Sequence, residues 1–339
     1  MHTTKRVTTF RKLCLFGAIL AFCVIVLGAY VRLSHAGLGC PDWPGCYGHL
    51  TAGQAAENHH EVNAAFPDRP IEYEKALKEM LHRYLAATLG FVILVCAALA
   101  WRNRRDPHQP VRMPLALVGL VIFQGLLGMW TVTLLLKPAI VSAHLAGGLT
   151  TMALLWWMSL ETTRRSRPKS ENSLRRWAVI GMCVLAAQIL LGGWVSTNYA
   201  AVACPDFPTC QRSFWPSMDF KDAFVLWRGL GIDYEGGVLD HPARVAIHFT
   251  HRIGAVVAAF VLGFVAFKAV RTGHSSGVRS AGLALAAALV AQLLVGPIMV
   301  LKTFPLSLAT AHNAVAALLV LAMVALLRFL HPPKGSGIY

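Results

Sequence analysis

Four histidines stand at related places near the start of long apolar stretches. They are His82, His144, His251 and His312. Ionisable side chains inside a membrane are costly and usually functional. Two imidazoles from neighbouring helices of a four-helix bundle can bind a haem iron from both faces. The sequence therefore predicts one haem site from His82 with His144 and another from His251 with His312.

A single histidine in such a place is more simply explained by a hydrogen bond to a neighbouring helix. The repeated spacing of four of them favours iron ligation instead. A metal ion without porphyrin is a weaker alternative, because no Cys-x-x-Cys, His-x-x-x-His or Glu-rich cluster within the apolar stretches completes a metal shell.

Glu79 precedes His82 by three residues, so the two side chains share one helix face. We expect Glu79 to act as a general base or proton acceptor beside the first haem. The matching position in the second pair is His248. This asymmetry predicts a reaction at the first site and a retained cofactor at the second. The alternative is a simple ion pair of Glu79 with Lys75 or Arg83.

Arg83 and Arg252 directly follow the first histidine of each pair. Their guanidinium groups could hold haem propionates in bidentate pairs. The alternative is that they reach towards the membrane surface. Arg32, at the end of the first apolar stretch, has no basic counterpart, because Ser196 occupies the matching position.

Four cysteines lie in two loops predicted to face an oxidising compartment, where disulfides are permitted. They are Cys40 with Cys46 and Cys204 with Cys210. In the chain-entropy model, a disulfide that closes so short a loop stabilises the folded state by about 2 kcal/mol. Structural stapling of the loops is the favoured interpretation, and redox exchange is the alternative.

An internal repeat positions all these residues. The segment 40–46 reappears as 204–210, the pair 82–83 as 251–252, and Gln124, Gly128 and His144 as Gln292, Gly296 and His312. The chain is predicted to be two copies of a four-helix unit, residues 1–160 and 177–339, joined by a cytoplasmic linker at 161–176. Because each copy has an even number of spans, the repeat is parallel, with its axis along the membrane normal.

The 339 residues are 56% hydrophobic and 14% charged, against about 25% charged in soluble domains. A soluble globular protein is excluded, and an all-α polytopic membrane protein is predicted. Eight spans are expected near 13–32, 80–101, 113–135, 140–160, 177–197, 246–268, 280–301 and 307–328.

The net charge of +15 is a topology signal, because 19 of the 31 Lys and Arg residues fall in alternate loops and the two termini. No nucleic-acid partner is expected. Both termini are predicted in the cytoplasm, and the cysteine loops in the periplasm of a bacterial inner membrane. Within the second long loop, aromatic residues at helical spacing over 220–228 predict a helix in the headgroup layer.

Taken together, the motifs resemble those of the haem A synthase family. The resemblance rests on the segment 28–44, on Glu79-x-x-His82-Arg83, on the other three histidines and on the two Cys-Pro-Asp-aromatic-Pro-x-Cys loops. It covers essentially the whole chain. The resemblance implies oxidation of the C8 methyl of haem O to the formyl group of haem A, with water supplying the oxygen.

The resemblance also implies the contents of each half and the partners. Haem O would lie between His82 and His144, and a prosthetic haem b between His251 and His312. Loop disulfides are expected, with the first pair nearer the reaction. Implied partners are haem O synthase, cytochrome oxidase assembly factors, an unidentified electron acceptor and a second copy of the chain.

Two other classes of protein remain open at this point. A dihaem b membrane cytochrome linked to quinol would also need histidine pairs across a bundle, and would leave both haems unmodified. A haem exporter would be expected to show broken helices and a polar path at mid-membrane, whereas the ionisable residues here gather at one membrane face.

Overall fold

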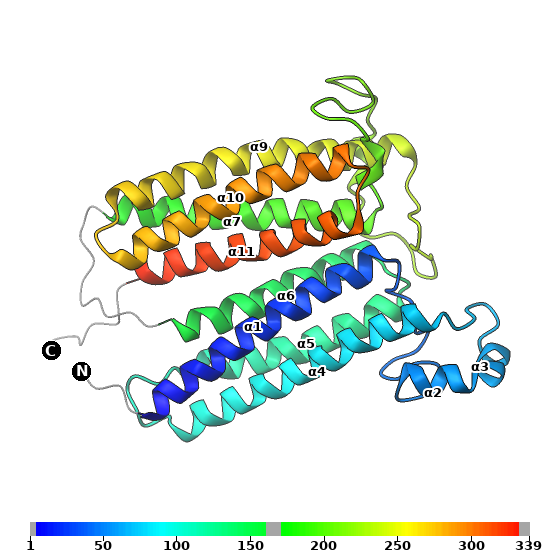
Figure 1. Cartoon of the computed structure of the whole chain (residues 1–339), viewed down its shortest axis with the longest axis horizontal. Coiled ribbons are helices and arrows are strands. Elements are labelled where there is room, and N and C mark those ends of the chain that lie inside the picture. The colour runs from blue at the N-terminus through cyan, green and yellow to red at the C-terminus, as the bar shows by residue number, and fades with distance from the viewer. Residues whose placement is uncertain (1–4, 161–170, 332–339) are drawn as a thin grey trace.

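The computed structural model describes residues 5–160 and 171–331, which form eight long and four short helices and no strands within those ranges (Figure 1). The long helices are α1 (Lys5–Leu33), α4 (Tyr73–Arg102), α5 (Arg112–Thr133), α6 (Pro138–Ser159), α7 (Glu171–Thr197), α9 (His241–Thr272), α10 (Ser276–Leu301) and α11 (Leu306–Leu330). All eight are long and apolar enough to cross a membrane, which confirms the eight predicted spans.

The long helices divide into two groups of four (Figure 1). In the first half α1 packs on α4, α4 on α5, α5 on α6 and α6 on α1, which closes a ring. The second half repeats this ring with α7, α9, α10 and α11. Between the halves α1 contacts α11, α6 contacts α7, and α6 contacts α11. Exchanging the halves maps this set of contacts onto itself, which is consistent with the predicted parallel repeat.

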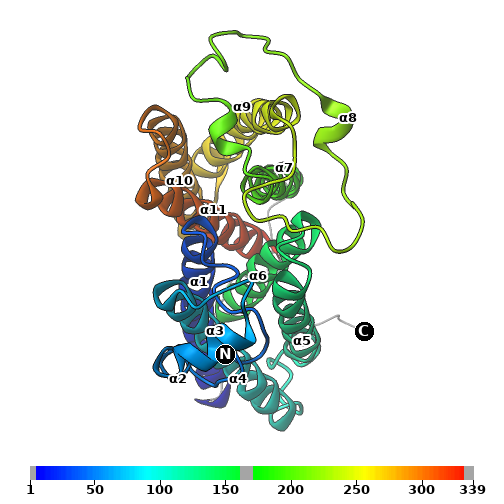
Figure 2. The same cartoon turned by 90° about the vertical axis from the view of Figure 1, so that its right-hand side faces the viewer.

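Both cysteine loops lie at the same end of the bundle, called here the disulfide end. The first loop carries α2 (Ala52–Glu57) and α3 (His59–Ala65), which lie at the end of the first half (Figure 2). The second carries η1 (Ala201–Ala203) and α8 (Phe220–Ala223). The two loops share details of backbone conformation at matching positions. For example, His35 and Tyr199 both have φ of 53°.

Side chains inside each ring are buried, whereas many large apolar side chains on the outside are exposed. Phe91 of α4 and Phe260 of α9, for example, are 66% and 76% exposed. They occupy matching positions in the two halves. Exposed apolar surface of this extent is what a helix bundle surrounded by lipid tails presents.

The helix predicted over 220–228 is wrong in its length, because α8 ends at Ala223. Asp219 caps its start by accepting from the backbone N–H groups of Lys221 and Asp222. Beyond it the chain is held in another way: Lys137 Nζ donates to the carbonyls of Arg228 and Gly229 at 2.5 and 2.7 Å. These contacts tie the residues after α8 to the first half.

Residues 227–235 thus cross from the second half to the first, and are called here the crossing segment. Tyr234 N donates to the Leu135 carbonyl at 3.1 Å, and Arg69 pairs with Asp233 at 2.7 Å and with Glu235 at 3.4 Å. Of the linker predicted at 161–176, residues 161–170 lie outside the described residues and the remainder belongs to α7.

Candidate functional site

Each histidine of the first half faces a glycine on the preceding ring helix. A side chain at Gly28 of α1 would place its Cβ 2.8 Å from Cε1 of His82 on α4. A side chain at Gly128 of α5 would place its Cβ 3.6 Å from Cε1 of His144 on α6. Both histidines lie on helices of the same ring, α4 and α6. The ring of helices therefore brings this predicted pair together within one bundle.

The second half repeats the arrangement. A Cβ at Gly192 of α7 would lie 3.0 Å from Cε1 of His251, and one at Gly296 of α10 would lie 3.4 Å from Cε1 of His312. These two histidines likewise lie on helices of one ring, α9 and α11. All four glycines were visible in the sequence as repeated positions, but the sequence did not show that they face the histidines.

The Nδ1 nitrogen of His251 differs from those of the other three histidines. Nδ1 of His82, His144 and His312 is buried without a hydrogen-bond partner among the described residues. Nδ1 of His251, in contrast, lies 3.0 Å from the side-chain amide of Gln188, which also donates to the His251 carbonyl at 3.0 Å. Buried imidazoles with unused nitrogens fit a set of ligands for haem iron, and a partner on the second nitrogen commonly orients such ligands.

Gln188 is a site residue that sequence reasoning missed. Its match in the first half is Val24, so the repeat gave no signal for it. Gly254 makes room for the amide, because a Cβ there would lie 2.2 Å from Gln188 Oε1. The matching residue in the first half is Leu85, so Gln188 with Gly254 replaces Val24 with Leu85. In the same half Gln292 Nε2 lies 3.2 Å from His312 Nε2.

Glu79 lies where α4 meets the first disulfide loop, with only 5% of its surface exposed. Its Oε1 accepts from Arg83 Nη2 at 2.5 Å and its Oε2 accepts from the Cys40 backbone N–H at 3.0 Å. Gly39 allows this approach, because a Cβ there would lie 2.6 Å from the Lys75 carbonyl carbon. Of the two predicted ion pairs, the structure has the one with Arg83. A role in proton transfer stays a prediction.

His248 takes the matching place in the second half and is also buried. Arg252 Nε donates to His248 Nε2 at 3.3 Å. The first site therefore carries an acidic group in contact with its disulfide loop, and the second carries an imidazole.

Arg83 and Arg252 hold the disulfide loops. Arg83 Nη1 donates to the carbonyls of Asp42 at 3.0 Å and Gly45 at 2.5 Å. Arg252 donates to the carbonyls of Thr209 at 2.7 Å and Cys204 at 2.9 Å. Contact with haem propionates stays a prediction, but these donors already have acceptors.

Both loops are closed by disulfides, Cys40–Cys46 and Cys204–Cys210. Within each disulfide loop an aspartate accepts hydrogen bonds from two backbone N–H groups that follow the second cysteine. Asp42 accepts from Tyr47 at 2.6 Å and Gly48 at 2.8 Å. The repeated Cys-Pro-Asp was a signal for this role, which sequence reasoning did not use.

Asp206 does the same in the second loop, accepting from Gln211 at 2.7 Å and Arg212 at 2.9 Å. It also accepts from the Thr209 hydroxyl. The hydroxyl donor, followed by the backbone donors, lowers the pKa of Asp206 below its ordinary value.

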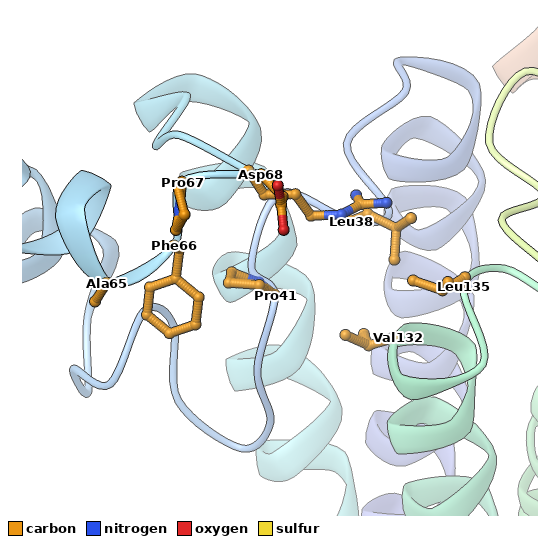
Figure 3. A pocket seen from close by; sticks show the side chains of 9 residues that line it. Leu38, Pro41, Ala65, Phe66, Pro67, Asp68, Val132 and Leu135 are labelled. Atoms are coloured by element: carbon orange, nitrogen blue, oxygen red, sulfur yellow. The ribbon is translucent and has the colours of Figure 1, made fainter. Parts of the chain in front are cut away.

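A cavity of about 300 Å³ opens at the disulfide end of the first half. Leu38 and Pro41 of the first loop line it, together with Phe66, Val132 and Leu135 (Figure 3). It lies beside the crossing segment rather than between the histidines. No group of three or more His, Cys, Asp or Glu side chains that could hold a bare metal ion occurs in residues 5–160 and 171–331.

The fold and the site define a class: an integral membrane protein of two similar four-helix rings, each with two half-buried histidines that face glycines of the same ring. The sequence matches the COX15-CtaA family, described as cytochrome oxidase assembly protein, over residues 11–324. The chain belongs to this family.

Individual relatives agree over nearly the whole length. The chain is 42% identical to a protein named Heme A synthase from Shewanella oneidensis, over 92% of this chain and 94% of that protein. Proteins of the same name from Caulobacter vibrioides and Rhizorhabdus wittichii are 29% and 27% identical, over 89% and 94% of this chain and 90% and 93% of theirs.

Proposed function

We propose that the chain is a haem A synthase, which oxidises the C8 methyl group of haem O to the formyl group of haem A. The observation that carries this proposal is the 42% identity, over 92% of the chain, to a protein named Heme A synthase. The pairs of histidines facing glycines in both halves support it, because a haem-handling enzyme needs such ligand sets.

We assign haem O to His82 and His144, and a prosthetic haem b to His251 and His312. The support is the difference between the halves. Gln188 fixes the orientation of His251, which suits a cofactor that stays bound. The first half lacks this amide and places Glu79 three residues before His82, which suits a substrate that is transformed and released.

Conversion of a methyl group and one water to a formyl group releases four electrons and four protons. The bound haems would supply the path for the electrons to an acceptor outside the protein. Glu79 would accept protons, because its carboxylate is buried and lies one helical turn before His82. Arg83 would hold this carboxylate in place through its 2.5 Å contact. Ligation of the iron by two histidines would leave no open position for dioxygen, which agrees with water as the oxygen source.

The proposed location is a bacterial cytoplasmic membrane, with both termini in the cytoplasm and the disulfide end in the periplasm. The Lys and Arg distribution supports this orientation. Proposed partners are the enzyme that farnesylates haem to make haem O, the cytochrome oxidase assembly factors, an electron acceptor and a second copy of the chain.

The test is expression of the chain in a host that makes haem O but no haem A, followed by chromatography of the extracted pigments. We expect haem A together with its hydroxylated precursor, and neither in the host alone. A folded, haem-loaded protein that yields neither pigment would favour the dihaem b cytochrome instead.

A further inference from the structure

The guanidinium of Arg32 lies between the two halves at the disulfide end. Nη2 donates to the Ser196 carbonyl at 2.8 Å, and Cζ lies 4.3 Å from the centroid of the Tyr199 ring. Nε is buried and has no acceptor in the part of the chain that the structure describes. No Asp or Glu side chain in that part pairs with Arg32. Arg32 is half-buried, and a guanidinium with a buried N–H that has no acceptor is suited to bind an anion there.

A second donor at the same place also lacks an acceptor. The Tyr199 hydroxyl is buried without a partner among the described residues. Tyr199 is held by Arg32 on its ring and by the stacked ring of His35, 5.7 Å away. Two adjacent side chains therefore have donors with no protein acceptor.

Arg32 and its acceptor Ser196 lie one helical turn from the glycines that face one histidine of each pair. Arg32 is four residues after Gly28, so it shares the face of α1 that meets His82. Its acceptor Ser196 is likewise four residues after Gly192, which meets His251. Because Arg32 and Ser196 are matching residues in contact, the guanidinium lies near the axis that relates the halves.

The other arginines near the histidines have fewer free donors for a haem carboxylate. Arg83 and Arg252 donate to loop carbonyls, and Arg83 also to Glu79. A haem carries two carboxylates, and guanidinium groups bind carboxylates strongly.

We infer that Arg32 and Tyr199 form a binding site for a haem carboxylate, placed so that it can serve the haem of either half. This inference rests on the proposed function, because that function supplies the haems. The second half has no cation of its own at the position of Arg32. The site is therefore a single one between two related bundles.

The experiment measures haem binding and not turnover. The probe is haem B, titrated into the purified full chain and followed by its Soret absorbance. His144→Ala and His312→Ala backgrounds leave one intact histidine pair at a time. In each background Arg32 is changed to Gln or Lys, Tyr199 is changed to Phe, and the exposed Lys302 is changed to Gln as a matched loss of one cation. Each titration is repeated with the dimethyl ester of haem B, which has no carboxylate.

We expect Arg32→Gln to weaken haem B binding by about tenfold in at least one background, which is the effect of losing one charge-assisted hydrogen bond. Arg32→Lys should recover most of the affinity, Tyr199→Phe should lose less, and Lys302→Gln should change nothing. The ester should bind the Gln variant and its parent equally.

Two results would overturn the inference while leaving the proposed function intact. One is unchanged haem B affinity of Arg32→Gln in both backgrounds. The other is an equal loss for haem B and its ester, which would assign Arg32 to packing or to a lipid phosphate. Failure of the unmodified chain to bind haem would overturn the proposed function itself and this inference with it.

Discussion

The two halves have the same ring of helices, the same histidines facing glycines and the same disulfide loop, but they differ next to the histidines. The first half has Glu79 in contact with its loop, and Val24 where the second has Gln188. The second has His248, and a glutamine on the ring of His251. The comparison teaches that the fold repeats the same arrangement of histidines and glycines, and that the two copies differ in a few neighbouring residues.

The largest expected effect follows loss of a ligand in the first half. His82→Ala should lower haem A production by at least about 100-fold, because iron ligation is lost outright. The second haem should remain, as judged from the visible spectrum of the purified protein. His251→Ala is the matched variant, and it should remove the second haem instead. Loss of the same haem in both variants would contradict the division between halves.

Glu79→Gln should lower haem A production by about 100-fold with both haems retained, because proton transfer commonly contributes that much. The amide oxygen can still accept from one of the two donors, Arg83 or the Cys40 N–H, but the amide cannot take up a proton. The measurement is the ratio of haem A to haem O in extracted pigment. His248→Gln, at the matching position, should have a much smaller effect. Full haem A output from the Glu79 variant would rule out a proton-transfer role.

Gln188→Val would make the second half resemble the first. We expect loss of the second haem to become about tenfold faster. Mutation of a hydrogen-bond partner of a metal-ligating histidine typically lowers metal affinity by about 10- to 100-fold. Transfer of haem to excess apomyoglobin measures this rate. The reciprocal change, Val24→Gln with Leu85→Gly, should slow loss of haem from the first half. Unchanged rates would show that the amide does not hold the cofactor.

The smallest effect concerns acid stability of the second loop. The folded-state pKa of Asp206 is lowered, so its contribution to stability is present above the unfolded pKa, about 3.9, and is lost as pH falls through the folded value. Thr209→Gly copies the matching Gly45 and removes the hydroxyl donor. The pKa of Asp206 should rise towards its ordinary value, so acid unfolding should begin at higher pH. Thr209→Ser, which keeps the hydroxyl donor, is the control, and circular dichroism across pH 2–6 makes the comparison.

The sequence predicted the parts of this structure that depend on periodic apolar patterns and on repeated motifs. All eight spans and the grouping of the histidines follow from these signals. The hydrogen-bond partners of Arg83 and Arg252 could not be predicted in this way. They are loop carbonyls, and apolar periodicity does not describe the path of a loop. Gln188 was missed because it breaks the repeat. The predicted length of the helix at 220–228 was wrong. The contacts of Arg228 and Gly229 with Lys137, which is distant in sequence, are of a kind that helical spacing does not indicate.

The crossing segment makes the first half depend on the second. The ammonium group of Lys137 is almost wholly buried, with 2% of the residue exposed, and its acceptors are supplied by the other half. Trp227, also from the other half, covers it at 3.8 Å. The first bundle cut from the chain would therefore keep a stranded cation and a bare apolar rim around Val132. The second half therefore supplies both the acceptors and the aromatic cover of this lysine, so the first bundle depends on the second for its stability.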